Sequence, residues 1–556
     1  MPHQNHFHDW SALAEKLWIA QFVPEAYAAY RPLLSEGLQF FMERLSSERL
    51  NDILAEQLQL PRTTSSARRL IALLRHCPTL HKLGQVVARD RRLSSELREN
   101  LQGLESLTPT TSLETITAIV HREWGRIPGL DIAPEALAEA SVAVVVPFVW
   151  RDSQKSIPCQ GVFKVLRPGV AERMDEELAI WSALGPFLEE RCAVHGLPIL
   201  DYRHTLDSVR RLLENEVRLD QEQTHLAQAA VFHADSPKVL IPRLLPFCTP
   251  RMTAMERVEG WKVTEPGPHP TEQRRLVETL IEALIAKPFW NYPESDACFH
   301  ADPHAGNLFL TRDGRLAILD WALVTPLGKA QRVAVVQTVM NALRQDQTGV
   351  AQAITSLGHL SDPTALHDAV AVGLRQVRQG TFPGMEWLMA LLDRLGTAGA
   401  MRFPEELTLF RKAMLTLSGV VHDVAGSSPI DAVLIQTGLQ QYCRELPARQ
   451  FAPFDSRAFG THLSNADVVD FVAGLPMAQL RYWLETWRDA LDAKHTALFG
   501  RAPISRARDS VGHPRNPRRF RKTNSPSPGQ TVRGDVLESR REAPDPWEAP
   551  DPTADP

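Results

Sequence analysis

The feature that most constrains this chain is one short segment, FHADPHAGNLFLTRDGRLAILDWALV, which runs from Phe299 to Val324. It places Asp302, Asn307 and Asp320 among phenylalanine, leucine and isoleucine residues that are typical of short strands. An ionised carboxylate is costly to bury unless a partner compensates its charge. The segment therefore predicts that cations or other polar partners meet these residues in the folded protein.

The spacing of the polar residues indicates which partners these are. His300, Asp302 and Asn307 form the pattern H-x-D-x-x-x-x-N, and Asp320 follows thirteen residues after Asn307. In a kinase catalytic loop of this spacing, one Asp orients the nucleophile while the Asn and a second Asp hold metal ions against phosphates. Mg²⁺, which prefers oxygen ligands, would compensate the carboxylates. Each residue alone could be a turn former or helix cap, but four matching positions favour the site.

Two upstream residues supply further parts of such a site, in the expected order along the chain. Lys164, in GVFKVLRPG, lies on a predicted strand, where a lysine can reach the phosphates of a nucleotide. Glu222, on the following predicted helix, is the candidate for an ion pair with Lys164. A lysine on a strand is often only solvent-facing, and Glu214 and Glu216 offer alternative partners. Order and spacing favour the functional interpretation.

The other nucleotide contacts are predicted at a hinge and in a loop. Glu256 and Val258, in AMERVEG, stand where a hinge would offer backbone groups to adenine. The G-x-G-x-x-G loop of kinases is absent before the strand lysine, and LAEASVAVVV, with Ala140 and Ser141, stands in its place. Side chains in such a loop limit how closely backbone amides approach phosphates. We therefore expect the nucleotide to be held differently than in an ordinary protein kinase.

Composition argues against several other classes of protein. The 556 residues carry a formal net charge of −5, so we expect no specific binding of nucleic acid. Six widely spaced cysteines form no C-x-x-C pair, which argues against a zinc ribbon or a dense disulfide framework. No apolar run approaches the roughly 20 residues of a membrane-spanning helix, and the start lacks the pattern of a secretory signal. We expect a cytoplasmic protein with at most peripheral membrane contact.

Periodicity divides the chain into four parts. Residues 1–125 show the apolar spacing of helices. Within 126–265, SVAVVVPFVW and GVFKVLRP predict a β-hairpin, and SVRRLLENEVRLDQEQTHLAQAAVF predicts a helical stretch. Residues 266–500 return to helical periodicity around the short strands, which carry an Asp313-Gly314 turn. Residues 501–556, rich in Pro, Arg, Ser and Asp, are predicted to be disordered.

Taken together, HADPHAGN, FKVLRPG, the alanine-containing loop and HKLGQ resemble the UbiB/AarF family of atypical protein-kinase-like proteins, over about residues 74–424. HADPHAGN is the most specific motif, and Lys82 to Gln85 match the K-x-G-Q signature. The resemblance implies an α+β, bilobal protein-kinase-like fold with a small β-rich N-lobe and a mainly helical C-lobe. It also implies an N-terminal helical extension that lies over the active site and excludes protein substrates.

The resemblance further implies ATP and Mg²⁺ as cofactors and assigns roles to residues. Members of the family are regarded as ATPases or unconventional kinases that support isoprenoid lipid metabolism, notably ubiquinone synthesis, often at a membrane. A lipid or quinone-pathway partner is thus implied beside the nucleotide. The roles implied are catalytic for Asp302, Lys164 and Asn307, metal-binding for Asn307 and Asp320, and nucleotide-binding for Lys164, Glu222, Lys82, Gln85, Ala140, Ser141, Glu256 and Val258.

Two departures from the family pattern keep an alternative open. The family's E-x-D reads Glu216-Val217-Arg218, which reverses a charge near the phosphates, and D-F-G reads Asp320-Trp321-Ala322, which loses the flexible glycine. The leading hypothesis is an ATP- and Mg²⁺-dependent ATPase or kinase of a small molecule or lipid. The alternative is a nucleotide-binding pseudokinase that acts as a scaffold or switch. A phosphotransferase of the aminoglycoside or choline kinase type shares the H-x-D loop but does not explain HKLGQ.

Overall fold

The computed structural model describes residues 19–87, 93–102, 111–139, 142–151, 158–197, 202–265, 270–291, 296–426, 429–480 and 484. Ala140 and Ser141 lie outside the described residues, as does the tail 501–556 that the sequence predicts to be disordered. The side chain of Gln85 also lies outside them, although its backbone is described. Predictions that fall on these positions stay predictions.

The predicted helical extension is present and has a core of its own. Its elements are η1 (Ile19–Phe22), η2 (Glu25–Tyr30), α2 (Arg31–Met42), α3 (Ser47–Gln59), α4 (Ser66–His76), α5 (Pro78–Val87), α6 (Ser95–Gln102) and α7 (Leu113–Trp124). The Ser65 hydroxyl accepts the Arg68 backbone N–H at the start of α4, which satisfies a donor that a helix start leaves free. Apolar residues from α2 to α6 pack into one cluster, which Ile180 and Trp181 of α8 (Val170–Val194) complete.

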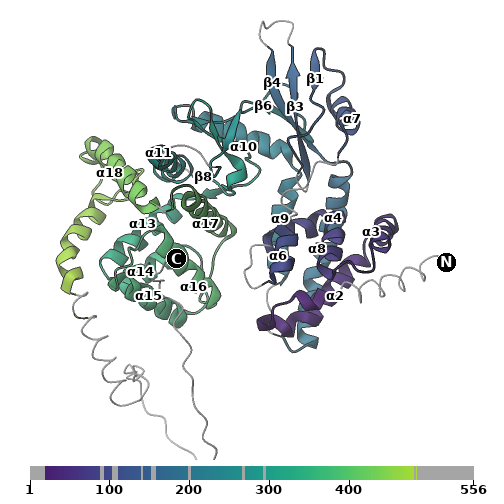
Figure 1. Ribbon diagram of the computed structural model, residues 1–556. Helices are drawn as coiled ribbons and strands as arrows, with labels where there is room; N and C mark the ends of the chain where they lie inside the picture. Colours follow the sequence, from purple (N-terminus) through teal and green to yellow (C-terminus); the bar gives the residue numbers. More distant parts are fainter. Residues whose placement is uncertain are drawn as a thin grey trace, which may run out of the picture. The chain divides into compact units, whose positions relative to one another are not determined.

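The predicted β-hairpin is confirmed and forms the centre of the small lobe. A five-stranded sheet has the order β1-β3-β4-β6, with β2 on β3. Its strands are β1 (Leu130–Ile132), β2 (Ala138–Glu139), β3 (Ala143–Trp150), β4 (Cys159–Leu166) and β6 (Met252–Glu256), of which β3 and β4 lie side by side in Figure 1. Phe148 and Phe163 stack at 4.0 Å in the core beneath one face. Val162, on the alternate face with Lys164, belongs to the large core of the C-terminal half.

The helical stretch predicted over residues 208–232 consists of two helices. α9 (Tyr202–Glu216) ends before Arg218, which lies just ahead of α10 (Leu219–Phe232). The apolar spacing continues across the break, so periodicity alone did not reveal it. The break matters because it places Glu216 and Glu222 on separate helices. The extension helices α2 and α5 pack on α8, which in turn contacts α9.

The segment 257–259 leads from the first sheet to a second one. β6 ends at Glu256, and β7 (Gly260–Lys262) pairs with β9 (Leu308–Thr311). The second sheet has the order β5-β10-β9-β7, with β5 (Val239–Leu240) and β10 (Leu316–Ile318). β9 and β10 form the predicted hairpin, in which Gly314 has φ +81°, a conformation that suits glycine. Glu256 therefore ends β6, and Val258 lies in the link between the two sheets.

The larger lobe is mainly helical and contains the largest apolar core. Its elements are α11 (Pro270–Ile281), the π-helical η4 (Glu282–Ala286), α12 (Lys287–Trp290), β8 (Ala297–His300), η5 (Ala305–Asn307), β11 (Val324–Leu327), α13 (Lys329–Leu343), α14 (Gln347–Thr355), β12 (His359–Leu360), α15 (Pro363–Arg378), α16 (Met385–Thr397), β13 (Met401–Arg402), α17 (Glu405–Ala425) and α18 (Ile430–Arg449). β8 pairs with β11 and β12 with β13. The predicted α+β, bilobal architecture is confirmed. Across the described residues, no helix combines the length and apolarity needed to cross a bilayer.

A buried histidine ties residues near the end of the described chain to the larger lobe. The His462 ring donates from Nε2 to the Phe289 carbonyl at 2.7 Å, and Arg332 donates to the same carbonyl at 3.3 Å. Both side chains are fully buried. Burial lowers the pKa of His462 to about 3, and the nearby guanidinium of Arg332 adds to the fall. The ring is therefore neutral in the folded protein at neutral pH.

This histidine makes stability depend on pH. Since the folded pKa lies below the unfolded value of 6.5, the contribution is complete above pH 6.5 and is lost as pH falls towards 3. We expect the free energy of unfolding to fall by about 1.4 kcal/mol per pH unit in that range from this group alone. Urea unfolding from pH 7 to 5 should show a shallower decline in His462→Gln. The control is His367→Gln at an exposed position, and equal slopes in all three proteins would contradict the assignment.

Candidate active site

Lys164 lies between two carboxylates that come from different elements. Its Nζ atom donates to both oxygens of Glu222 on α10 at 2.8 Å and to Oδ2 of Asp320 at 3.1 Å. The side chains are 13%, 2% and 36% exposed for Lys164, Glu222 and Asp320 respectively, so the Asp320 end is the open one. The structure thus joins the predicted strand lysine, helix carboxylate and metal-binding aspartate in one network.

Burial and charge set the ionisation of this network. Burial disfavours charge on Lys164, but Asp320 and Glu222 outweigh it and raise the pKa of the ammonium above its usual value. Burial raises the pKa of Glu222 to about 7, with Lys164 opposing the rise. Burial also opposes ionisation of Asp320, but Lys164 and the Ala322 backbone N–H hold its pKa below its usual range. Asp320 therefore stays ionised, the state in which a carboxylate can bind a metal ion.

His300 connects the loop of Asp302 to that of Asp320. Its Nε2 donates to the Asp320 backbone carbonyl at 2.5 Å, and its Nδ1 accepts the Asp302 backbone N–H at 3.2 Å. The ring is buried, and burial lowers its pKa, so it is neutral and can donate and accept at once. One side chain thereby fixes the backbone of both aspartates.

The Asp302 carboxylate has a cationic partner that the motifs did not reveal. Lys412 of α17 lies 3.0 Å from Oδ1, and His304 lies 3.6 Å from Oδ2. Burial opposes ionisation of Asp302, but Lys412 and His304, with a smaller effect of Lys82, hold its pKa below its usual value. A lone lysine on a helix far along the chain carries no sequence signal for this role.

Asn307 and Asp320 offer oxygen ligands of the kind that Mg²⁺ prefers. The Asn307 side-chain amide donates to the Asp302 carbonyl at 3.2 Å, which leaves its side-chain oxygen available, and its own carbonyl accepts the Leu319 N–H at 3.0 Å. That backbone bond brings Asn307 beside Asp320. One carboxylate, one amide oxygen and an open side are what Mg²⁺ needs when water and phosphate complete its ligands. The residues present fit the cofactor.

The K-x-G-Q lysine reaches the same site from α5. Lys82 pairs with Glu216 of α9 at 2.7 Å, and its burial is outweighed by Glu216, Asp302 and Asp320, which raise the pKa of its ammonium. A buried carboxylate anchors this helix, because Glu177 accepts the Thr79 backbone N–H at 2.9 Å. Sequence analysis did not identify Glu177, since its partners lie far away along the chain.

Other predicted residues lie further from the ion-pair network or outside the description. Glu256 pairs with Arg243 through a bond of 2.8 Å from Nε, and Arg243 holds the pKa of that carboxyl below its usual value despite burial. Val258 is half-buried in the link between the sheets. The Arg218 guanidinium forms two bonds of 3.0 Å with Asp220 and is exposed, so the structure pairs it with a carboxylate rather than leaving it free for phosphate.

The segment after Asp320 is packed in place. The Trp321 side chain is buried, its indole N–H donates to the Ile318 carbonyl at 3.3 Å, and its ring lies 4.9 Å from that of His300. The His225 ring meets the Trp321 carbonyl at 3.2 Å. These contacts fix the segment in the arrangement in which Asp320 meets Lys164.

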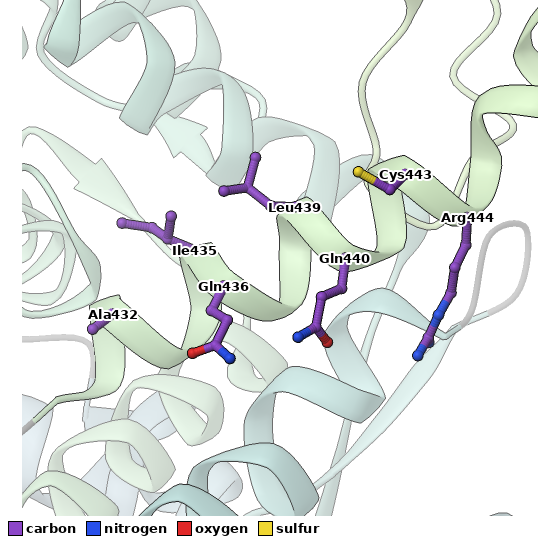
Figure 2. Close-up of a pocket in the computed structure, with 7 residues that line it drawn as sticks. All are labelled: Ala432, Ile435, Gln436, Leu439, Gln440, Cys443 and Arg444. Atoms are coloured by element: carbon purple, nitrogen blue, oxygen red, sulfur yellow. The ribbon is translucent and has the colours of Figure 1, made fainter.

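The hollow drawn in Figure 2 is a different feature. All seven residues that line it belong to α18, including the exposed Ile435 and Leu439. It shares no residue with the network of Lys164 and Asp302, and the labelled side chains project from one helix rather than enclosing a cavity. It is therefore no candidate for the nucleotide site.

The fold and the site define a protein with a kinase-like domain. A β-rich lobe carries the lysine, a helical lobe carries the H-x-D-x-x-x-x-N loop, and a helical extension adds Lys82. Residues 104–354 match the ABC1 atypical kinase-like domain. This match, together with several similar proteins described as UbiB protein kinases, supports the assignment of the chain to the UbiB/AarF family of atypical kinase-like proteins.

Several known proteins are similar to this chain. It is 24% identical to a protein described as "Probable protein kinase UbiB" from Marinobacter nauticus, over 65% of this chain and 67% of that one. It is 26% identical to the chloroplastic Protein ACTIVITY OF BC1 COMPLEX KINASE 3 of Arabidopsis thaliana, over 51% of this chain but only 39% of the plant protein. A Mycobacterium tuberculosis protein solved in complex with erythromycin is 19% identical, with a TM-score of 0.44 over 70% of this chain and 97% of that one.

Replacing Lys164 should lower the stability of the fold, because a buried carboxylate then lacks its cation. We expect Lys164→Met to lower the free energy of unfolding by about 3–5 kcal/mol, because Glu222 keeps its burial and loses its cation. Adding Glu222→Leu should restore part of the loss, since the pair is then replaced by apolar groups. Urea unfolding at pH 7.5 measures both effects, with the exposed Lys262→Met as control. A double variant less stable than Lys164→Met would contradict the ion pair.

Proposed function

We propose that the chain is an ATP- and Mg²⁺-dependent enzyme that transfers the γ-phosphoryl group of ATP to water or to a hydroxyl of a small molecule or lipid. The observation that carries the proposal is that His300 links the loop of Asp302 to the loop of Asp320. This ring bonds to the backbone of both Asp302 and Asp320, while Lys164 bonds to Asp320 and Glu222. The residues that phosphoryl transfer needs are thus held together.

Asp302 would orient the attacking hydroxyl or water. Its pKa lies below its usual value, because Lys412 and His304 outweigh the effect of burial, so it is an ionised but weak base. Such a carboxylate accepts a hydrogen bond from the nucleophile and fixes its direction of attack, rather than deprotonating it in advance. Phosphoryl transfer passes through a loose transition state, so this positioning is sufficient.

Lys164, Asn307 and Asp320 would hold the phosphate end of the nucleotide. Mg²⁺, when bound, supplies positive charge that neutralises the phosphate oxygens. Asn307 and Asp320 offer it oxygen ligands, and Lys164 offers an ammonium that the neighbouring carboxylates keep protonated. Glu222 keeps Lys164 in place through two bonds of 2.8 Å. Glu256 and Val258 would meet adenine at the link between the sheets.

The extension favours a small acceptor over a protein. Lys82 lies close enough to Asp302 and Asp320 for their charges to raise the pKa of its ammonium, and α5 carries it there on the Glu177 anchor. A helix that carries a lysine this close to Asp302 favours a small acceptor over a folded protein. An isoprenoid lipid or quinone intermediate, reached by a cytoplasmic protein in peripheral contact with a membrane, is the acceptor class that the resemblance to the UbiB/AarF family implies.

A scaffold or switch that binds nucleotide without turnover is the second candidate. The buried Trp321 favours it, since a fixed metal-binding segment limits the conformational change that many kinases use. It does not account for Asp302, which nucleotide binding alone does not need. The two candidates differ in turnover and share nucleotide binding.

Phosphate release from ATP separates them. We expect turnover in the presence of Mg²⁺, tested with and without anionic liposomes, to fall by about 10²–10⁴-fold in Asp302→Asn because the nucleophile loses its acceptor. Asp320→Asn should also weaken Mg²⁺-dependent nucleotide binding by more than about tenfold, or about 1.4 kcal/mol. Asp302→Asn should bind nucleotide as the wild type does.

The matched control is Asp313→Asn, which makes the same change in the exposed turn of the same segment and keeps a good turn sequence. It should leave turnover unchanged. A wild type that binds nucleotide through Asp320 but releases no phosphate under any condition would favour the scaffold. A wild type that binds no nucleotide would overturn both candidates.

A further inference from the structure

The ion pair between Lys412 and Asp302 is a contact at the site that neither the H-x-D-x-x-x-x-N motif nor the K-x-G-Q motif accounts for. Nζ of Lys412 lies 3.0 Å from Oδ1 of Asp302, whereas Oδ2 has only the longer contact of 3.6 Å with His304. Residues 104–354 carry the match to the kinase-like domain, so Lys412 lies beyond the matched segment. The two oxygens of the carboxylate are therefore unequal, with one held and one more open.

Packing fixes the place of Lys412 relative to the catalytic loop. On α17, the Phe410 ring meets the Phe299 ring edge-on at 4.9 Å, and both are fully buried. Thr325 of β11 donates from its hydroxyl to the Glu406 carbonyl of the same helix at 3.0 Å. Phe299 and Thr325 are direct partners in the β8–β11 pair, which leads straight into Asp302. α17 is thus joined to the strands that carry the loop, and Lys412 comes with it.

Stability alone does not explain the pair. The Lys412 side chain is 44% exposed and that of Asp302 is 27% exposed, and ion pairs in such positions stabilise a fold little. The other titratable groups near Asp302 are Lys82 on α5, which pairs with Glu216, and the loop histidines, His304 and the neutral His300. Among these groups, Lys412 makes the shortest side-chain contact with the carboxylate.

We propose that Lys412 is a positioning residue that holds Oδ1 of Asp302 and so directs Oδ2 at the attacking hydroxyl or water. The proposal rests on the proposed function in that its readout is phosphoryl transfer. Without the ammonium, the carboxylate rotates between orientations, and the fraction that faces the nucleophile falls. Arginine can restore the bond to Oδ1, whereas methionine has the length but no donor.

Steady-state ATP hydrolysis with Mg²⁺ tests this. We expect Lys412→Met to lower kcat by about tenfold or more and to leave KM for ATP within about twofold, because Lys412 acts on the nucleophile and not on the nucleotide. Lys412→Arg should recover kcat to within about threefold of the wild type. The exposed Lys238→Met serves as the matched control and should behave as the wild type.

The kcat of the double variant Asp302→Asn/Lys412→Met gives a second test. It should be no slower than Asp302→Asn alone, because Lys412 acts only through Asp302. Unchanged kcat in Lys412→Met would overturn the proposal. So would a raised KM at constant kcat, which would place Lys412 on the nucleotide, or an equal loss in the Met and Arg variants with a lower Tm.

A measurement without turnover separates failure of this proposal from failure of the proposed function. Thermal unfolding of the wild type, both single variants and the double variant in the absence of nucleotide reports on the pair directly. We expect all three variants to unfold at a Tm close to that of the wild type, because a part-exposed ion pair stabilises a fold little. If the wild type hydrolyses no ATP, the proposed function fails, while a clear loss of Tm in Lys412→Met would assign the pair to stability and overturn the positioning role in any case.

Discussion

The structure of the site depends on one ammonium group placed between two carboxylates. Lys164 comes from β4, Glu222 from α10 and Asp320 from the loop before β11, so one ion-pair network joins the small lobe, its helix and the large lobe. Such a network is costly to bury unless every member is paired. The cost makes the arrangement selective, because any movement that separates these elements leaves a buried charge without its partner.

His300 extends this constraint from charge to backbone. A neutral imidazole that donates to the Asp320 carbonyl and accepts from the Asp302 N–H couples the loops of these two aspartates. The buried Trp321 packs against the same ring, so the large residue that replaces the family's phenylalanine supports the coupling. Loss of the usual glycine therefore need not mean loss of the site. It removes freedom from a segment that is already in the arrangement that brings Asp320 to Lys164.

Local patterns predicted the local parts of this structure. The β3–β4 hairpin and the Asp-Gly turn were predictable because neighbouring residues determine them. The break between α9 and α10 was missed, because the apolar spacing continues through Val217. Lys412 and Glu177 were missed for a different reason, since their meaning arises only when α17 and α8 pack beside the loop and the extension. Motif spacing identifies the candidate site residues, but it does not identify the distant residues that hold them in position.

The helical extension shows how contacts far along the chain position a residue at the candidate site. Glu177 is a fully buried carboxylate, and burial raises its pKa, yet it is paired with Arg49 and bonded to Thr79, so α5 is tied to α8 at its first turn. α5 then carries Lys82 to Glu216, near Asp302 and Asp320. An acidic residue at Glu216 keeps a partner for Lys82 even though Arg218 replaces the aspartate two residues later and pairs with Asp220 instead. Asp220 thus compensates the charge of Arg218. The residue of the E-x-D motif that contacts the extension, Glu216, is the one that the chain retains.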